Sequence, residues 1–215
     1  MISRNFKKRL FTSVLLLFLL IIIFNIKILF LYSIIVLSVI SIIEFLDMTK
    51  RFLKNKISFC LINFSFLIYV FLFCSIIIFF YFHIYLKLIL FSLLACCIAS
   101  DIGGYFFGNI FKGPKLTRIS PNKTISGAIG SLFLSCLVLI ILFYFLSINV
   151  DIKIAISAII ISLACQGGDL FFSLLKRKAK IKDTGSLLPG HGGVLDRIDG
   201  ILIGIPAGII VINYL

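Results

Sequence analysis

The chain has 215 residues, of which 61% are hydrophobic, 24 are phenylalanine and only 13% are charged. This composition excludes a soluble globular domain, which does not need so much apolar surface, and indicates an integral membrane protein. The net charge of +13 does not predict a nucleic-acid partner, because the basic residues gather in short groups between apolar segments and form no basic face interleaved with aromatic residues.

Apolar runs predict an all-α, polytopic membrane bundle of about seven transmembrane helices, folded as a single domain over residues 1–215. The expected spans are 10–24, 28–46, 57–82, 88–108, 126–148, 154–175 and 199–215. The first span follows a basic segment as a signal peptide would, but no small-x-small cleavage site follows it, so we expect it to be uncleaved.

Charge alternation predicts the orientation of the bundle. Most basic residues form four groups, at 4–9, 50–56, 112–123 and 176–197. Single lysines lie between the groups, at Lys27, Lys87 and Lys153. Because basic residues are enriched on the cytoplasmic side of membrane proteins, this pattern places the N-terminus and the four groups in the cytoplasm.

Several polar residues have no predicted role in chemistry. The six cysteines all lie in apolar segments without a C-x-x-C pair, so we expect small apolar packing residues. His83 is a lone histidine at the outer end of a span. Glu44 and Asp47 lead into the basic turn 50–56, and we interpret them as an ordinary interfacial helix end.

Asp101 is the first candidate for function, because it lies near the end of the apolar segment 88–108. Placing a carboxylate at membrane depth costs about 2.5–3.5 kcal/mol on insertion scales, so a compensating interaction or a function is expected for it. A metal ligand is one reason, and an ion pair made for helix packing is the alternative. Gly103, Gly104 and Gly108 follow it and allow the close approach of a helix or a ligand.

The polar loop 109–125 combines lysines with hydroxyl groups just before the next apolar run. Ser120, Lys123 and Thr124 supply hydrogen-bond donors at a predicted helix start, where free backbone N–H groups also favour anions. This pattern predicts phosphate binding. A positive-inside anchor would explain the lysines but not the run Ser-Pro-Asn-Lys-Thr-Ile-Ser-Gly.

The last two spans carry the densest set of ionisable groups. Asp169, Ser173 and Lys176 are four and three residues apart, so they share one helical face. Asp196 and Asp199 share a face at the start of the final span. Counting spans from a cytoplasmic N-terminus brings these residues, Asp101 and the 120–124 loop to the same side of the membrane.

Carboxylates from three helix ends predict a site for a hard cation such as Mg²⁺, which prefers carboxylate and phosphate oxygens. The predicted metal residues are Asp101, Asp169, Asp196 and Asp199. The side chains that would neutralise a triphosphate are Lys123, Lys176, Arg177, Lys182 and Arg197. Gly192 and Gly193 let the backbone approach phosphate closely.

The stretch 173–199 resembles the signature of the phosphatidate cytidylyltransferases, or CDP-diacylglycerol synthases. The fixed polar and small positions of that signature are occupied by Ser173, Lys176, Arg177, Lys182, Asp183, Gly185, Pro189, His191, Gly192, Gly193, Asp196, Arg197 and Asp199. A second motif of the family, Ser-Pro-x-Lys-Thr before a glycine-containing helix, is matched by Ser120, Pro121, Lys123, Thr124 and Gly127. The resemblance covers about 100–200, whereas 1–99 hold N-terminal spans of weak signal.

The resemblance implies that the chain makes CDP-diacylglycerol and pyrophosphate from CTP and phosphatidate with Mg²⁺, with K⁺ as a candidate second cation. It implies metal binding by Asp169, Asp196 and Asp199, and phosphate contacts from Ser120 and Lys123. His191 is either an acid–base group or a donor to phosphate. A bacterial-type inner membrane location, a site facing the cytoplasm and a homodimer as a candidate assembly are implied as well.

Two other functions are compatible with the residues. A CTP-dependent lipid kinase of the dolichol or phytol type would share the nucleotide and the membrane setting. An ion-coupled transporter would use intramembrane carboxylates to carry ions. Transport is disfavoured because the acidic residues cluster toward one membrane face and no pair of broken helices recurs in two halves.

Overall fold

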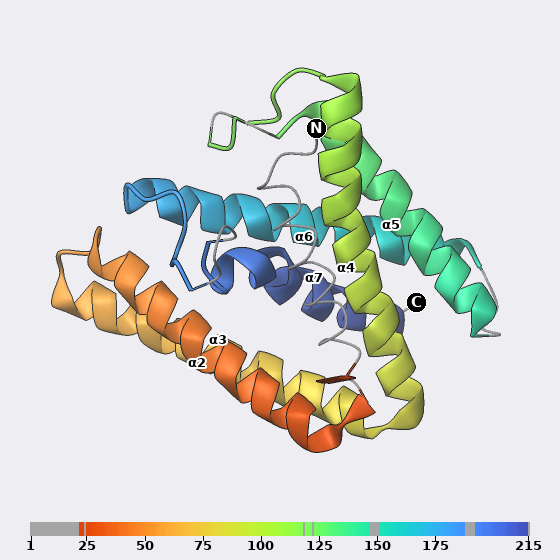
Figure 1. The fold of residues 1–215 in the computed structure, drawn as a ribbon, viewed down its shortest axis with the longest axis horizontal. Helices are drawn as coiled ribbons and strands as arrows, with labels where there is room; N and C mark the ends of the chain where they lie inside the picture. The colour runs from red at the N-terminus through yellow and green to blue at the C-terminus, as the bar shows by residue number, and fades with distance from the viewer. Residues whose placement is uncertain are drawn as a thin grey trace, which may run out of the picture.

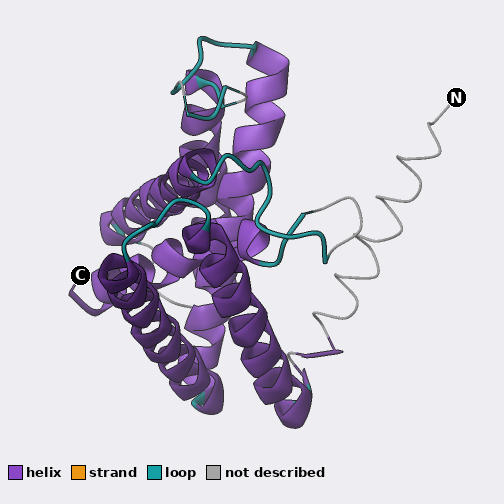
Figure 2. Ribbon diagram, turned by 90° about the vertical axis from the view of Figure 1, so that its left-hand side faces the viewer, coloured by secondary structure: helices purple, strands orange, loops and turns teal. Residues whose placement is uncertain are grey.

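The computed structural model describes residues 22–23, 25–117, 119–121, 123–146, 151–187 and 192–214. Its six named helices are α2 (Lys27–Lys50), α3 (Lys56–Phe82), α4 (Ile84–Phe111), α5 (Ile125–Phe145), α6 (Ile152–Lys178) and α7 (Leu195–Tyr214) (Figure 1). Within these residues there is no strand (Figure 2), and Lys115 and Thr124 form an isolated bridge. The all-α fold class is therefore confirmed.

Five of the described helices, α2 to α6, are long and apolar enough to cross a membrane. Their bounds agree with the expected second to sixth spans to within four residues at each end. The expected seventh span corresponds to α7, which begins earlier and so includes Asp196 and Arg197. The expected first span, 10–24, falls almost wholly outside the described residues. The chain is thus a multi-pass helical membrane protein.

Small residues let α4 pack closely against α5. A Cβ added at Gly103 would lie 3.0 Å from the Cα of Ser131, so a larger residue would push the helices apart. The Ser131 hydroxyl donates a hydrogen bond to the Ser100 carbonyl (2.7 Å), and the Ser100 and Ser162 hydroxyls are 2.8 Å apart. These bonds link α4 to α5 and α6 without any charged group.

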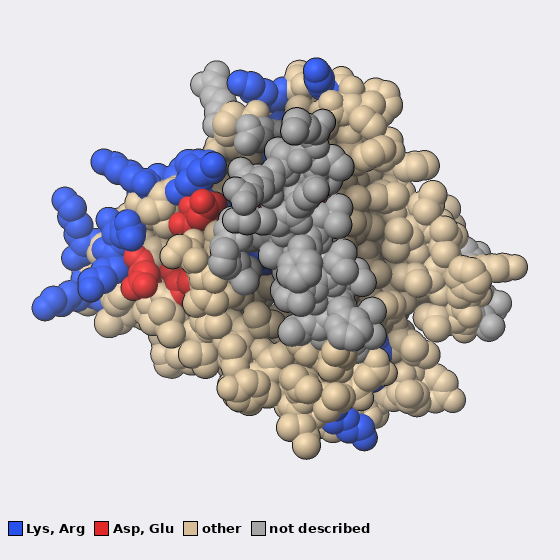
Figure 3. Space-filling model, in the orientation of Figure 1, with Lys and Arg blue, Asp and Glu red and all other residues tan. Residues whose placement is uncertain are grey.

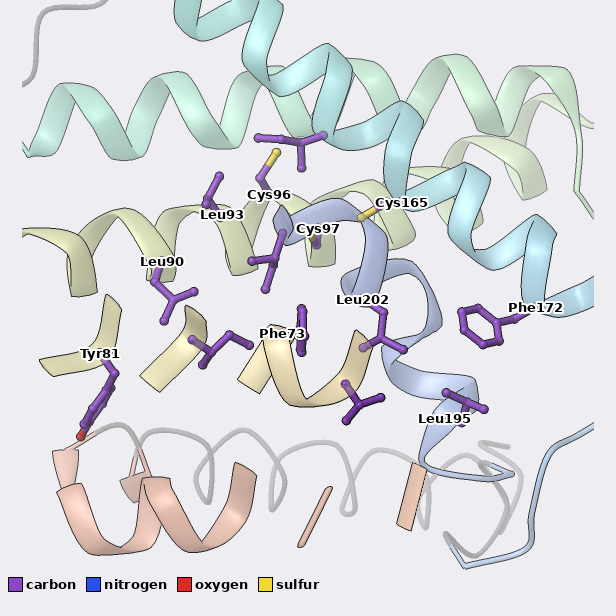
Figure 4. Close-up of a cluster of buried hydrophobic side chains, with 14 of the residues drawn as sticks. Phe73, Tyr81, Leu90, Leu93, Cys96, Cys97, Cys165, Phe172, Leu195 and Leu202 are labelled. Carbon is purple, nitrogen blue, oxygen red and sulfur yellow. The ribbon is translucent and has the colours of Figure 1, made fainter. Parts of the chain in front are cut away.

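The core between α3, α4, α6 and α7 is apolar and includes cysteine sulfurs (Figure 4). Cys96, Cys97 and Cys165 are fully or nearly fully buried. A Cβ at Gly204 would lie 2.9 Å from the Cys97 sulfur, so this glycine makes room for the thiols. All six cysteines are free, and Cys60 alone is exposed, on the outer face of α3. Packing roles for the buried cysteines agree with the prediction from sequence.

A tyrosine compensates for the proline inside α7. Pro206 has no N–H, so the carbonyl of Leu202 one turn earlier loses its helical donor. The Tyr69 hydroxyl from α3 donates a hydrogen bond to that carbonyl. Because a bilayer offers no water to an unpaired carbonyl, this single bond ties α3 to the middle of α7.

We predict that Tyr69→Phe destabilises the folded protein by roughly 1–3 kcal/mol, the range for leaving a buried acceptor unsatisfied. Thermal unfolding in detergent would show a lower midpoint than wild type. Tyr85→Phe is the matched control, since Tyr85 is 80% exposed. Equal midpoints for the two variants would show that the carbonyl does not depend on Tyr69.

Candidate active site

The predicted site residues come from α4, α6, α7 and two loops. Asp196 and Asp199 lie at the start of α7, as expected, but Asp101 and Asp169 lie ten and nine residues before the ends of α4 and α6, because both helices extend beyond the predicted spans. In Figure 1 the end of α6 and the start of α7 lie toward the left, and the 112–124 loop lies above them. Figure 3 shows most of the visible Lys and Arg side chains along the left and upper edges of the molecule, a few at the lower right, and the visible carboxylates only on the left. Opposite charges therefore meet on one side of a largely apolar bundle.

Lys123 links the 112–124 loop to α6. Its Nζ pairs with Oδ2 of Asp169, and the Ser173 hydroxyl donates to Oδ1 of the same carboxylate (3.3 Å). The Lys123 and Asp169 side chains are 26% and 33% exposed, so this pair is reachable from outside. The predicted face of α6 and the predicted phosphate loop thus meet at Asp169.

Lys176 lies between the two carboxylates of α7. Its Nζ is 2.8 Å from Oδ1 of Asp196 and 3.6 Å from Oδ2 of Asp199. All three side chains are at most 11% exposed. A buried carboxylate needs a partner, and one ammonium group serves two of them here.

Asp196 is almost completely engaged by the protein itself. Besides Lys176, its Oδ2 accepts hydrogen bonds from the N–H groups of Thr184 (2.8 Å) and Gly193 (3.0 Å). Gly192 has φ +81°, a conformation that favours glycine, and a Cβ there would lie 3.0 Å from Oδ2 of Asp196. This carboxylate therefore holds the turn before α7 in place.

Asp199 has weaker compensation. Its Oδ1 accepts a hydrogen bond from the N–H of the adjacent Gly200 (2.8 Å), and its only ion pair in the described structure is the 3.6 Å contact with Lys176. Asp101 and Asp169 lie near enough to add electrostatic repulsion. Carboxylates from α4, α6 and α7 (Asp101, Asp169 and Asp199) thus lie near one another, with Lys123, Lys176 and Arg197 as nearby cations.

This donor set fits the chemistry of Mg²⁺, since all three groups are carboxylates, whose oxygen atoms are the ligands that this cation prefers. No three acidic, histidine or cysteine side chains of the described residues are gathered tightly enough to enclose an ion as they stand. Lys123 and Lys176 occupy positions beside the carboxylates instead. Metal binding by Asp101, Asp169, Asp196 and Asp199 therefore stays a prediction.

Thr124 has a structural role besides its predicted one. It caps α5, because its Oγ1 accepts a hydrogen bond from the N–H of Gly127 (3.1 Å). The Ser126 hydroxyl accepts from the N–H of Gly113 (3.2 Å), and the N–H of Leu116 donates to the carbonyl of Lys123 (2.8 Å). The loop is thus folded back on the start of α5, which fixes where Lys123 projects. Ser120 is half-buried in the same loop.

A cavity of about 560 Å³ opens beside this loop. It is lined by Ile119, Pro121, Leu174, Arg177 and Lys178. Arg177 helps to form its wall by donating to the carbonyls of Ile119 (3.4 Å) and Ile181 (3.3 Å). The cavity therefore combines an apolar lining with two cationic side chains.

Of the remaining predicted residues, three lie in the described part of the chain and one lies outside it. Lys182 and Arg197 are exposed near the start of α7, and Gly193 is buried. His191 lies outside the described residues, so its role stays a prediction.

Interpreting Glu44 as an ordinary interfacial helix end was wrong. Its side chain is buried, and it accepts hydrogen bonds from Thr184, Val194 and Leu195, about 140 to 151 residues further along the chain. The sequence pattern does not indicate a role for Thr184 either, although its hydroxyl donates one of these hydrogen bonds. One signal in the sequence was available: a carboxylate in the apolar run Ser-Ile-Ile-Glu-Phe-Leu is costly to bury without a partner.

Removing the ammonium group of Lys176 would leave Asp196 and Asp199 buried without their cation. We predict that Lys176→Met lowers the free energy of unfolding by about 3–5 kcal/mol, the range for breaking a buried ion pair. Thermal unfolding in detergent measures this. Lys178→Met, at an exposed position two residues on, is the control and should unfold like wild type. A stable Lys176→Met protein would mean that the carboxylates have other compensation.

Comparison with known proteins shows which protein family the chain matches. The profile described as the cytidylyltransferase family matches residues 3–215. The chain is 45% identical over 109 residues to a phosphatidate cytidylyltransferase of Staphylococcus aureus (strain COL), which covers 50% of this chain and 42% of that protein. It is 44% identical over 113 residues to the protein of the same name from Mycobacterium leprae (strain TN), covering 52% and 36%. The matched segment thus spans less than half the length of these curated relatives.

Proposed function

Because the chain belongs to the cytidylyltransferase family, we propose that it is a CTP:phosphatidate cytidylyltransferase, a nucleotidyltransferase of phospholipid biosynthesis. The observation that carries this proposal is the meeting of Asp101, Asp169 and Asp199 with Lys123 and Lys176 at one end of a membrane bundle. Carboxylates for a cation and ammonium groups for phosphates are what a reaction between a nucleoside triphosphate and a lipid phosphate requires.

In the proposed reaction a phosphate oxygen of phosphatidate attacks the α-phosphorus of CTP. A new P–O bond forms, the bond from the α-phosphorus to the bridging oxygen of the β-phosphate breaks, and pyrophosphate leaves with that electron pair. No proton transfer to carbon or redox step is needed. The work of the protein is therefore to position two anions in line and to neutralise their charge.

Lys123 and Lys176 are placed to do this neutralisation. Both ammonium groups are now paired with carboxylates, and Lys123 is accessible on a flexible stem. Ser120 lies in the same loop as Lys123, and Lys182 and Arg197 are exposed near the start of α7, so all three could supply further donors to phosphate. Asp101, Asp169 and Asp199 would hold Mg²⁺, which when bound supplies positive charge to the phosphate oxygens.

We assign the lipid phosphate to the cavity lined by Leu174, Arg177 and Lys178. This cavity is a wide, open pocket of about 560 Å³, and its mixed lining suits a group that is anionic at one end and apolar at the other. The cavity adjoins the loop that carries Lys123, so a lipid there would lie beside the proposed triphosphate site.

We also propose that the protein lies in a bacterial-type inner membrane with this site facing the cytoplasm. The support is the basic edge around the site, because cytoplasmic loops are enriched in Lys and Arg (Figure 3). CTP is a cytoplasmic metabolite, so this orientation gives the nucleotide direct access. A homodimer and a second cation such as K⁺ stay predictions from the family resemblance.

Incubating the purified protein with CTP, phosphatidate and Mg²⁺ tests the function directly. We expect CDP-diacylglycerol and pyrophosphate in equal amounts, identified by mass spectrometry and a pyrophosphate assay. CDP together with a phosphorylated lipid alcohol, formed when a lipid alcohol replaces phosphatidate, would indicate the kinase instead. An absence of any nucleotide turnover would favour the transporter.

Asp199→Asn tests the undercompensated carboxylate. The amide keeps the size of the side chain but removes the anionic oxygen that a hard cation needs. We expect normal membrane insertion, a loss of at least about a hundredfold in kcat, by analogy with other electrostatic catalytic groups, and only weak rescue by excess Mg²⁺. Asp151→Asn is the matched control, because Asp151 is exposed at the opposite end of α6. Wild-type turnover by Asp199→Asn would exclude the metal role.

A further inference from the structure

Glu44 joins the N-terminal half of the chain to the candidate active site. It lies in the last two turns of α2 and is 6% exposed. Its Oε1 accepts a hydrogen bond from the N–H of Val194 (3.0 Å), and its Oε2 accepts from the N–H of Leu195 (2.8 Å) and the hydroxyl of Thr184 (2.9 Å). Every one of these donors belongs to the segment that contains the start of α7.

Two of the donors are backbone groups at the start of a helix. The first N–H groups of any helix lack partners within it, and here a carboxylate from another helix satisfies those of Val194 and Leu195. The negative charge also suits the positive end of the helix dipole of α7. Glu44 therefore acts as a cap that α2 supplies to α7.

The backbone around Glu44 is shaped to admit it. A Cβ at Gly185 would lie 3.1 Å from Cδ of Glu44, and a Cβ at Gly193 would lie 2.7 Å from its Oε1. The distance at Gly193 is shorter than real Cβ contacts and the distance at Gly185 is tighter than most of them, so these glycines leave space for the carboxylate. Their small size serves the contact with Glu44 as well as any approach of the backbone to phosphate.

Glu44 and Asp196 hold the same turn from two sides. Glu44 accepts hydrogen bonds from the Thr184 hydroxyl and from the N–H groups of Val194 and Leu195. Asp196 accepts hydrogen bonds from the N–H groups of Thr184 and Gly193. Asp199 follows Leu195 by one helical turn. A shift of the first turn of α7 would therefore move Asp199 relative to Asp169 and Lys176.

We propose that Glu44 is a positioning residue for the active site: by capping α7 and holding Thr184, it sets the position of Asp199 and of the Asp196–Lys176 pair. This proposal rests on the proposed function above. Glu44 itself acts only through these residues. Through Glu44, α2 contributes to the reaction although it lies outside the 100–200 region that carries the signature.

Glu44→Gln tests the proposal with little change in size. The amide keeps one acceptor oxygen and turns an NH₂ group toward N–H and O–H donors, so at least one hydrogen bond is lost. Since small misplacement of catalytic groups lowers rates by up to about a hundredfold, we expect kcat to fall by about tenfold to a hundredfold. The Mg²⁺ concentration for half-maximal rate should rise, while the KM for phosphatidate stays within about twofold.

Two variants serve as comparison. Glu44→Asp keeps both anionic oxygens on a stem one methylene shorter and should recover part of kcat and of the Mg²⁺ response. Asp47→Asn changes an exposed carboxylate on the same helix and should behave like wild type. A purely structural role for Glu44 would lower the amount of folded protein without changing the Mg²⁺ response of what remains.

Limited tryptic cleavage after Lys182, which is exposed two residues before Thr184, gives a readout independent of activity. We expect faster cleavage in Glu44→Gln than in wild type, both without substrates. If Glu44→Gln does not fold, Thr184→Val takes its place, since it removes only the hydroxyl; it should also be cleaved faster and lose kcat severalfold.

Unchanged cleavage would overturn the contact itself, and faster cleavage with unchanged kcat and Mg²⁺ response would overturn the positioning role. If wild-type protein makes no CDP-diacylglycerol, the proposed function fails. The cleavage rates would still decide whether Glu44 holds the turn before α7.

Discussion

The structure depends on compensation of buried charge by Lys176. One ammonium group lies 2.8 Å from Asp196 and 3.6 Å from Asp199, and together they join the end of α6 to the start of α7. Removing carboxylates from water is unfavourable unless cations and hydrogen bonds replace the hydration. The turn before α7 and the position of Asp199 both follow from how this requirement is met.

The same requirement explains the long-range contacts elsewhere in the bundle. The carbonyl that Pro206 leaves without a donor is satisfied by Tyr69 from α3, and the first N–H groups of α7 are satisfied by Glu44 from α2. A membrane protein cannot leave such groups to water in its interior. The unpaired carbonyl and the unpaired N–H groups both belong to α7. The hydrogen bonds from α2 and α3 therefore hold in place the helix that carries the candidate catalytic carboxylates Asp196 and Asp199.

Much of this arrangement could be predicted from the sequence. Apolar runs predicted α2 to α6 closely, because length and hydropathy alone decide a membrane span. Spacing predicted that Asp169, Ser173 and Lys176 share a face, since helical geometry is local, and the structure does link Ser173 to Asp169. The partners of Glu44 and the cap made by Thr124 were not predicted, because spacing in sequence says nothing about which distant backbone groups need an acceptor.

The four aspartates of the site therefore differ in their hydrogen-bond and ion-pair partners, which the sequence alone does not reveal. Asp196 has three strong partners and holds the fold, whereas Asp199 has one distant cation and lies near Asp101 and Asp169. Lys176 lies closer to Asp196 than to Asp199, so Asp199 has the weaker ion pair of the two. If a cation and a phosphate bind here as proposed, each reduces the electrostatic cost of binding the other, because the site already holds carboxylates and ammonium groups close together.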